Sequence, residues 1–425
     1  MSEENKNLNN EPEKAPVENH EEANKPLDKK NIIMIAAAAV VVIVAIVIAV
    51  VFGGGQSANN GNEGGNGGEQ GGNEGGNEGG NEGGNEGGNE GTNLKDYTLG
   101  LGVVVSFESS KTGLAQTDTT VATVVVDAEG KIVACRIDVA QNKVDITDGY
   151  ITVPSEFKTK MELGADYGMG GKPYSPDNDG DGRVLEWNEQ AMAFETWCVG
   201  KTLAEVENLI AEGNLQEANG HKFTTDADLL TAGCTIQITD FVNAVVKAYN
   251  DEFKVSFKSE GNFTLGLGVD SYDDGSKDAE DEDGSVLVYS DMAAVVKGTD
   301  GKTLAVLNDA IQPKITFDIA GEITSKTFNG AKRELKEDYG MGGKPYSPDN
   351  DGDGRVLEWY QQSAAFSAHV TGKTVAEIEA LGADENLQEA NGHKFTTNAD
   401  LLEAGCTIQI GAIVDVVVEA ANNAR

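Results

Sequence analysis

The order of apolar and polar residues divides the chain into distinct segments. Residues 1–31 are polar and almost without large apolar side chains, which predicts a disordered segment. Residues 32–52 carry no charge and are almost wholly Ala, Val and Ile. A run of that length crosses a hydrocarbon core of ~30 Å as a helix, so we expect a single transmembrane helix there. Residues 53–93 repeat Gly-Gly-Asn-Glu, which predicts a flexible linker.

The charges beside the apolar run predict its orientation. Lys29 and Lys30 precede it, and the next basic residue is Lys95. The positive-inside rule then places residues 1–31 in the cytoplasm and the remainder outside the cell membrane. A cleaved signal peptide is the competing interpretation. The long polar leader and the lack of a small-x-small cleavage site favour an uncleaved anchor.

From residue 94 the pattern becomes that of a globular protein. β-Branched runs at residues 121–126 and 131–137 flank a turn at 127–130, which predicts a hairpin. Apolar residues at helical spacing predict helices over residues 187–199 and 241–249. Thr202 and Thr374 each begin a Thr-x-x-Glu capping box, which predicts a helix start. Strands followed by helices indicate an α+β domain.

This pattern occurs twice. Residues 166–187 recur without change at residues 338–359, and the front halves match more loosely, as in Tyr97-Thr-Leu-Gly-Leu-Gly and Phe263-Thr-Leu-Gly-Leu-Gly. We therefore predict domains at 94–255 and 256–425. The expected fold class is α+β: two tandem small sheet-plus-helix domains after a single transmembrane helix and a disordered linker.

The charge balance is strongly acidic, with 71 Asp and Glu against 32 Lys and Arg and a formal net charge of -39. Such a chain repels nucleic acid, so we expect no nucleic-acid partner. The same charge attracts cations.

An acidic loop in each repeat has the beginning of an EF-hand pattern, Asp-x-Asp-x-Asp-Gly. Alternate carboxylates converge on one cation in such a loop, and outside the cell even weak calcium affinity suffices. The twelfth position of an EF-hand loop is normally Glu, but here it is Asn188 or Tyr360. Glu186 or Glu358, two residues earlier, completes the site only if the loop follows a different path. The alternative is a solvated acidic turn. The predicted Ca²⁺ ligands are Asp177, Asp179, Asp181, Arg183 (carbonyl) and Glu186, and in the second repeat Asp349, Asp351, Asp353, Arg355 and Glu358.

Several short motifs occur in a specific order along the first repeat. They are Gly100-Leu-Gly102, the hairpin at 127–132, residues 159–169, Glu186-Trp187 with Gln190, residues 200–206 and Gly233-Cys-Thr235. In this order the sequence resembles the FMN-binding domain family, an extracytoplasmic flavoprotein domain, and most of all a variant from surface proteins of Gram-positive anaerobes. The resemblance covers each whole repeat.

The resemblance implies a site. In that family a flavin transferase esterifies FMN through its phosphate to the last Thr of a Ser/Thr-Gly-Ala-Thr motif, and Thr235 and Thr407 stand at this position. Gly233 and Gly405 supply the small neighbours that let a phosphate approach the backbone. Cys replaces the usual Ala, so non-covalent binding, or none, stays open. The alternative is a Thr that satisfies backbone groups at a turn.

Together these features predict a membrane-anchored extracytoplasmic FMN-binding protein that carries electrons rather than converting a substrate of its own. Its expected partners are the bilayer, through residues 32–52, a flavin transferase and redox proteins. The alternative is a calcium-stabilised cell-surface binding or structural module that has lost the flavin. Tyr167, Met169 and Trp187 either stack on the flavin or pack in the core. Cys135 and Cys198 form either a disulfide or two buried thiols.

Overall fold

The computed structural model describes residues 94–170, 185–218, 221–342, 357–390 and 393–425. They lie within one compact unit, Gly88–Arg425. The fold is α+β, and its two halves follow the sequence repeat.

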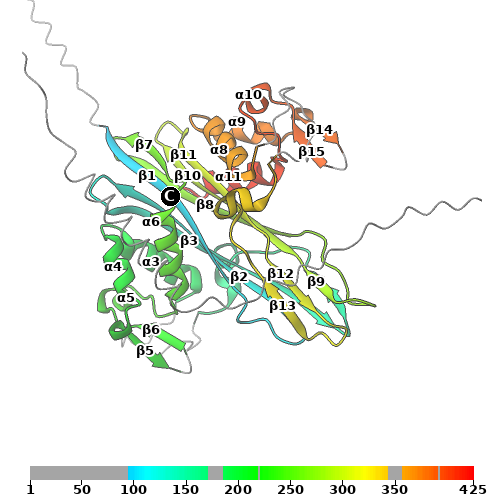
Figure 1. Ribbon diagram of the computed structural model, residues 1–425. Helices are drawn as coiled ribbons and strands as arrows, with labels where there is room; N and C mark the ends of the chain where they lie inside the picture. Colours follow the sequence, from blue (N-terminus) through cyan, green and yellow to red (C-terminus); the bar gives the residue numbers. More distant parts are fainter. Residues whose placement is uncertain (1–93, 171–184, 219–220, 343–356, 391–392) are drawn as a thin grey trace, which may run out of the picture. The chain divides into compact units, whose positions relative to one another are not determined.

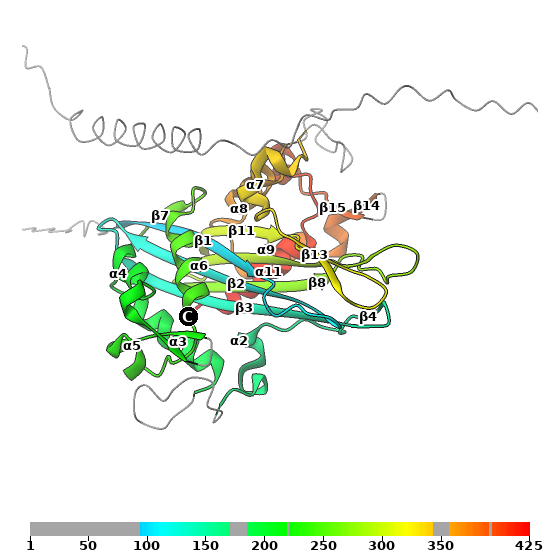
Figure 2. The same cartoon turned by 60° about the horizontal axis from the view of Figure 1, so that its bottom comes forward.

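The first repeat is built on an antiparallel sheet of five strands in the order β4-β3-β2-β1-β7. The predicted hairpin is confirmed as the β2–β3 pair, which extends well beyond the β-branched runs. Figure 2 shows the long strands of this sheet beside one another. The bounds are β1 Lys95–Ser106, β2 Leu114–Asp127, β3 Ile132–Thr147, β4 Tyr150–Thr152 and β7 Val255–Ser259.

The second repeat divides the corresponding strands between two antiparallel sheets, β11-β10-β8 and β13-β12-β9. Each repeat also has a two-stranded ribbon between its helices, β5-β6 in the first and β14-β15 in the second. The bounds are β5 Leu215–Ala218, β6 His221–Thr224, β8 Phe263–Asp273, β9 Gly284–Val286, β10 Val288–Gly298, β11 Thr303–Ile311, β12 Lys314–Phe317, β13 Ile323–Thr327, β14 Leu387–Ala390 and β15 His393–Thr396.

The helices follow the strands in each repeat, as expected. Figure 1 shows α3 to α6 gathered beside the first sheet and α8 to α11 beside the second repeat's strands. The predicted helices and both capping boxes are confirmed in α3, α4, α6 and α9. The bounds are α2 Lys160–Leu163, α3 Trp187–Cys198, α4 Leu203–Asn208, α5 Ala227–Thr231, α6 Thr239–Asn250, α7 Lys332–Leu335, α8 Trp359–Val370, α9 Val375–Glu379, α10 Ala399–Glu403 and α11 Gly411–Asn422.

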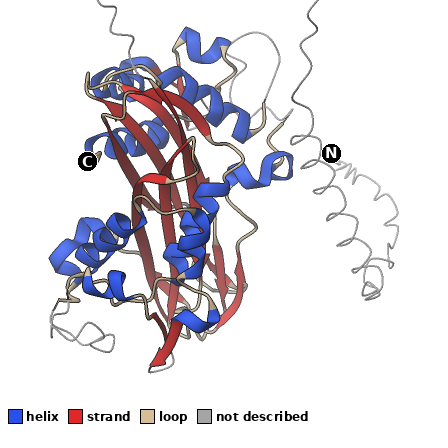
Figure 3. Ribbon diagram, turned by 90° about the vertical axis from the view of Figure 1, so that its left-hand side faces the viewer, coloured by secondary structure: helices blue, strands red, loops and turns tan. Residues whose placement is uncertain are grey.

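The sheets of the two repeats pack face to face. The inner face of β1, with Leu99 and Leu101, joins one apolar cluster with Leu267 and Met292 of the second repeat. The outer faces carry separate clusters with the helices, α3 and α6 in the first repeat and α8 and α11 in the second. Figure 3 shows the long strands in red with helices packed beside them. The second half of β2 is covered on both faces, and there residues 121–126 are apolar except for Thr123 and do not alternate with polar residues.

The boundary predicted between residues 255 and 256 falls inside β7. This strand pairs with β1 and so completes the sheet of the first repeat.

The Gly-Leu-Gly motif allows a helix to lie directly on a strand. A Cβ on Gly100 would lie 1.9 Å from the carbonyl oxygen of Ala248 in α6, and one on Gly102 would lie 2.4 Å from the Ala248 nitrogen. The corresponding Gly266 would lie 1.7 Å from the carbonyl oxygen of Ala420 in α11. Only glycine permits this approach, so the motif positions α6 and α11, whose N-terminal ends border the candidate site.

The structure corrects the prediction of a single-pass membrane protein. Among the residues that it describes, no helix is long and apolar enough to cross a bilayer. The longest of these helices have 12 residues, whereas a crossing needs about 20 apolar residues. The segment 32–52, to which the span was assigned, lies outside the described residues, as do 1–31 and the linker 53–93. The fold class is therefore stated as α+β, and the predicted membrane localisation is not supported.

Candidate functional site

The threonines predicted to accept FMN lie between a short helix and the last helix of each repeat. Thr235 is 5% exposed and Thr407 is 4% exposed. The N–H and hydroxyl of Thr235 both donate to Oε1 of Gln190, at 2.9 and 3.2 Å. Thr407 makes the same two bonds to Gln362, at 2.8 and 3.2 Å. The hydroxyls therefore face the protein interior and not solvent, where an esterifying enzyme would need them.

The glutamine in each repeat links three segments. Gln190 is fully buried on the inward face of α3, and its Nε2 donates to the Leu185 carbonyl at 2.9 Å and to Met169 Sδ at 3.5 Å. Gln362 makes the matching bonds to Leu357 and Met341. The sequence signal for this role was a glutamine at helical spacing from Trp187 and Phe194, on the buried face of α3.

The small neighbours of the threonines have a conformational role. Gly233 has φ +93° and Gly405 has φ +86°, a region that side chains with a Cβ rarely adopt. A Cβ would also lie 2.6 Å from Leu185 Cδ1 in the first repeat and 2.7 Å from Leu357 Cδ1 in the second. These contacts explain the glycines without a bound phosphate.

Two of the predicted calcium ligands are described. Oε2 of Glu186 accepts the Met169 N–H at 2.9 Å, and Oε2 of Glu358 accepts the Met341 N–H at 3.0 Å. Each glutamate thus ties the start of its helix to the segment before the acidic loop. Elsewhere in the described ranges, no group of three or more His, Cys, Asp or Glu side chains is placed to hold a metal. The other predicted ligands lie outside the described residues: Asp177, Asp179, Asp181, Arg183, Asp349, Asp351, Asp353 and Arg355.

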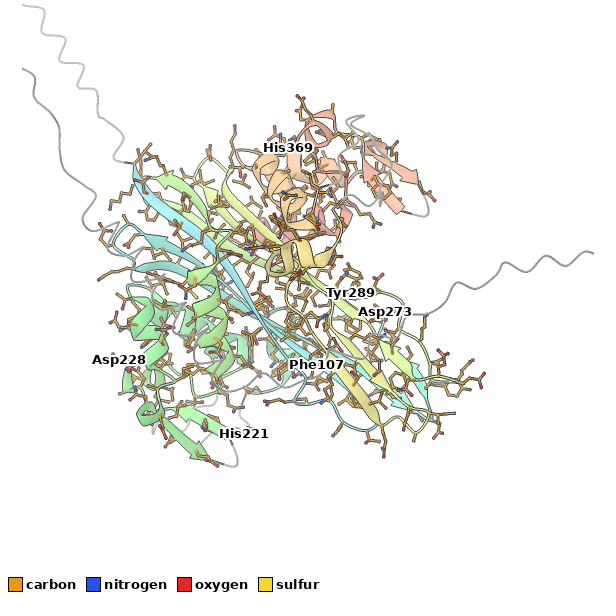
Figure 4. The ribbon with its side chains drawn as sticks, viewed as in Figure 1. Phe107, His221, Asp228, Asp273, Tyr289 and His369 are labelled. Carbon is orange, nitrogen blue, oxygen red and sulfur yellow. The ribbon has the colours of Figure 1, made fainter. Side chains whose placement is uncertain are left out.

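A cavity of about 310 Å³ lies beside the threonine motif of the first repeat, and one of about 420 Å³ lies at the matching place in the second. Figure 4 labels His221 at the first cavity and Tyr289 at the second. Both volumes fall within the range of small-molecule sites, roughly 300–1,000 Å³. Eight lining residues are identical: Gln141, Lys160, Tyr167, Met169, Trp187, Phe223, Ile236 and Gln237, matched by Gln312, Lys332, Tyr339, Met341, Trp359, Phe395, Ile408 and Gln409.

A lysine lies over aromatic rings in both cavities. Lys160 Nζ is 5.0 Å from the Tyr167 ring centroid and 5.4 Å from that of Trp187. Lys332 Nζ is 5.3 Å from each of the Tyr339 and Trp359 rings. Burial lowers the pKa of Lys160, while nearby carboxylates raise it. A cation beside an aromatic wall suits a planar ligand that carries negative charge.

The N-terminal end of a long helix borders each cavity. Gln237 and Asp240 bring the start of α6 to the first cavity, and Gly411 and Ala412 bring the start of α11 to the second. Neither helix has a side-chain cap, so its first N–H groups carry the positive end of the helix dipole. This end of each cavity therefore favours an anionic group. The preference is stronger in the second repeat, because Ala412 stands there in place of Asp240.

The four cysteines are free and buried thiols in the structure. The thiols of Cys135 and Cys198 interact, and this interaction together with burial raises the pKa of Cys135. They contribute to the core of the first repeat with Cys234 and do not line either cavity.

Comparisons with known proteins give one weak similarity. No protein-family model matches the chain, and no solved structure matches it significantly. A protein named chlorophenol reductase, from Desulfitobacterium hafniense, is 28% identical over 195 residues. The match covers 35% of this chain and 56% of that protein's length.

Proposed function

We propose that the protein is an electron carrier that holds one FMN without a covalent bond in each of its two cavities. The observation that carries the proposal is the duplicated cavity with the same lysine, aromatic rings, methionine and glutamine in both copies. FMN supplies the redox chemistry, and the chain supplies binding, orientation and electrostatics.

The aromatic wall fits the ring system of such a cofactor. Trp187 and Tyr167 in the first cavity, and Trp359 and Tyr339 in the second, give a planar ring a surface for stacking. All four residues line the cavities, but Trp187 and Trp359 belong to the core clusters and are 3% and 4% exposed, so most of the exposed ring surface comes from Tyr167 and Tyr339.

One part of each cavity suits the phosphate, although carboxylates also line the cavities: Glu108, Asp118 and Asp240 in the first, and Asp274 and Asp291 in the second. Lys160 or Lys332 offers a cation from one side, and the N-terminal end of α6 or α11 offers backbone N–H groups from another. The buried Thr235 and Thr407 favour a non-covalent complex over the ester implied by the resemblance. The name of the reductase from Desulfitobacterium hafniense adds a weak indication of redox chemistry.

The test is an FMN titration of the full-length protein, followed by its visible absorbance and by reduction with dithionite. We expect two FMN per chain, and we expect Trp187→Ala combined with Trp359→Ala to weaken binding roughly 5- to 150-fold, because base–aromatic stacking contributes ~1–3 kcal/mol. Trp197→Ala is the matched control, because this tryptophan lies outside both cavities.

Two results would change the proposal. A protein that neither contains nor binds FMN would exclude the function. Fluorescence that stays with the denatured chain on a gel, and disappears in Thr235→Ala combined with Thr407→Ala, would show the covalent form instead.

A further inference from the structure

The two cavities differ in the residues that come from their sheets. Leu99 of β1 pairs with Val125 of β2, and Leu265 of β8 pairs with Val296 of β10, which sets the alignment between the repeats. Five residues earlier, β2 has Thr120 where β10 has Asp291. The other replacements at the cavities follow the same alignment: Ser106 by Tyr272, Asp118 by Tyr289 and Glu108 by Asp274.

Asp291 is a buried carboxylate on the central strand of its sheet. It is 5% exposed and lies opposite Asp270 of β8 and Ala310 of β11. The Tyr272 side chain interacts with the carboxylate, and Lys332 attracts it across the cavity. Its Oδ2, however, has no hydrogen-bond partner among the described residues.

An unpartnered oxygen of this kind is costly. Leaving a buried charged acceptor without a donor forfeits its hydration, and native proteins nearly always satisfy such atoms. The first repeat has Thr120 at this position and so avoids this cost, because a hydroxyl is smaller than a carboxylate, is neutral and can donate a hydrogen bond. The carboxylate in the second repeat is therefore explained best by a donor that enters the cavity.

The walls beside Asp291 favour a flat donor. The rings of Tyr272 and Tyr289 lie edge to face, with centroids 6.2 Å apart, and both border the cavity with Trp359. In the first cavity the places of the two tyrosines are taken by Ser106 and Asp118. The second cavity is thus larger, more aromatic and equipped with a buried acceptor.

We propose that the cavity of the second repeat binds a planar aromatic ring through ring N–H groups that donate to Asp291, a contact that the first cavity lacks. The inference rests on the proposed function for the identity of the ring, because the flavin ring system carries such an N–H group. The two cavities then bind the same cofactor with different affinities and different hydrogen bonds.

Two ring compounds test this contact directly. Lumichrome has the tricyclic ring with its N–H groups, and 1,3-dimethyllumichrome has the same ring without them. The full-length protein with Trp187→Phe and Trp197→Phe keeps Trp359 as the one tryptophan of the sequence, so quenching of its fluorescence reports on the second repeat. Asp291→Thr, which introduces the residue of the first repeat, is made in this background, and a thermal melt checks that it folds.

We expect Asp291→Thr to weaken lumichrome binding about 10- to 100-fold, as for the loss of a hydrogen bond to a charged group. The dimethyl compound should bind both proteins equally and more weakly than lumichrome binds the parent. Equal binding of lumichrome to both proteins, equal binding of the two compounds to the parent, or no binding of lumichrome would overturn the inference.

An FMN titration of the same two proteins separates the inference from the proposed function. If FMN fails to bind but lumichrome binds in an Asp291-dependent way, the flavin function fails and the ring contact stands. If FMN binds both proteins equally, the function stands and the contact fails.

Discussion

At the scale of single residues, the buried glutamines explain more of the candidate site than the threonines do. Gln190 and Gln362 make the same set of bonds in both repeats, to a threonine, a methionine sulfur and a leucine carbonyl. The threonine motif is thereby held against α3 or α8. The backbone N–H and the hydroxyl of the threonine both donate to the glutamine, so the hydroxyl is used in holding the motif in place.

Gln190→Met keeps the length of the side chain but leaves the Thr235 N–H and hydroxyl without an acceptor. We expect the free energy of unfolding to fall by about 2–4 kcal/mol, since each buried unsatisfied group costs ~1–3 kcal/mol. Urea denaturation measures the change. Gln237→Met is the control, because this glutamine is exposed and should change stability by less than about 0.5 kcal/mol. Similar losses for the two variants would contradict the assigned role.

Buried carboxylates give stability a specific pH dependence. Burial raises the pKa of Asp138 to about 6 and that of Asp291 to about 6, although hydrogen bonds and Lys332 lower them. Glu162 raises the first, and Asp270 and Asp309 raise the second. An unfolded Asp titrates near ~3.9, so the folded state binds these protons more tightly. Their contribution is present below pH ~4 and is lost as the pH rises through about 6.

Urea denaturation at several pH values between about 4 and about 7 should therefore show the free energy of unfolding falling as the pH rises. Asp138→Asn keeps Oδ1, which accepts the Val139 and Met161 N–H groups at 2.6 and 3.1 Å. This variant should flatten the profile by on the order of 1–3 kcal/mol. An unchanged slope would show that Asp138 is not protonated in the folded state.

At the scale of elements, the contact between helix and strand decides where the site lies. α6 and α11 lie so close to β1 and β8 that any side chain at Gly100 or Gly266 would collide with helix backbone. Since the N-terminal ends of these helices border the cavities, a displaced helix would also change the site.

Gly100→Ala should lower the free energy of unfolding by at least about 1–3 kcal/mol, the usual cost of overpacking a core, because the backbone of α6 must move. Thermal or urea denaturation measures this cost. Gly213→Ala offers a matched control, since no atom lies within 4 Å of its added Cβ. Equal effects of the two substitutions would refute the close approach as the reason for Gly100.

The acidic loops remain a sequence-based prediction. If they bind Ca²⁺, the metal stabilises the folded state by about 2.7 kcal/mol at a hundredfold excess over Kd. The Tm should then rise with Ca²⁺ and fall with a chelator. Asp177→Asn combined with Asp349→Asn should remove most of this response, whereas a Tm that ignores both Ca²⁺ and chelator would rule out these sites.

At the scale of the whole molecule, the two repeats share one core and a buried ion cluster. Arg333 of the second repeat bonds Asp309 at 3.1 Å and Asp251 of the first repeat at 3.2 Å. All three side chains are nearly inaccessible to solvent. The first repeat has Met161 at the position that matches Arg333, so it has no equivalent of this arginine-centred cluster.

Arg333→Met introduces the residue of the first repeat and leaves two buried carboxylates without their cation. We expect a loss of about 3–5 kcal/mol in the free energy of unfolding, as for other broken buried ion pairs. Adding Asp309→Asn and Asp251→Asn should restore much of it, because the uncompensated charges are removed. A single variant as stable as the parent would show that the cluster does not stabilise the joined repeats.

The sequence by itself determined the repeat, the β2–β3 hairpin, the longer helices and their capping boxes. Those features depend on residues that are close along the chain, such as Thr202 with Glu205, and so their signals are local. It left Tyr167, Met169 and Trp187 either to stack on a flavin or to pack in the core. In the structure Met169 and Trp187 belong to the core cluster of the first repeat and Tyr167 packs against it, and all three also line the first cavity. The predicted membrane helix is not supported by any described helix.

Only the tertiary structure decided that the sheets pack on each other, that Thr235 faces inward, and that the two cavities differ. Leu99 and Leu267 belong to one apolar cluster because two sheets far apart in the chain each bury one apolar face, a pairing that periodicity cannot predict. Asp291 looks like any strand carboxylate in the sequence. Its proposed role as a ligand acceptor follows from its burial on a central strand beside a cavity, where no described donor reaches Oδ2.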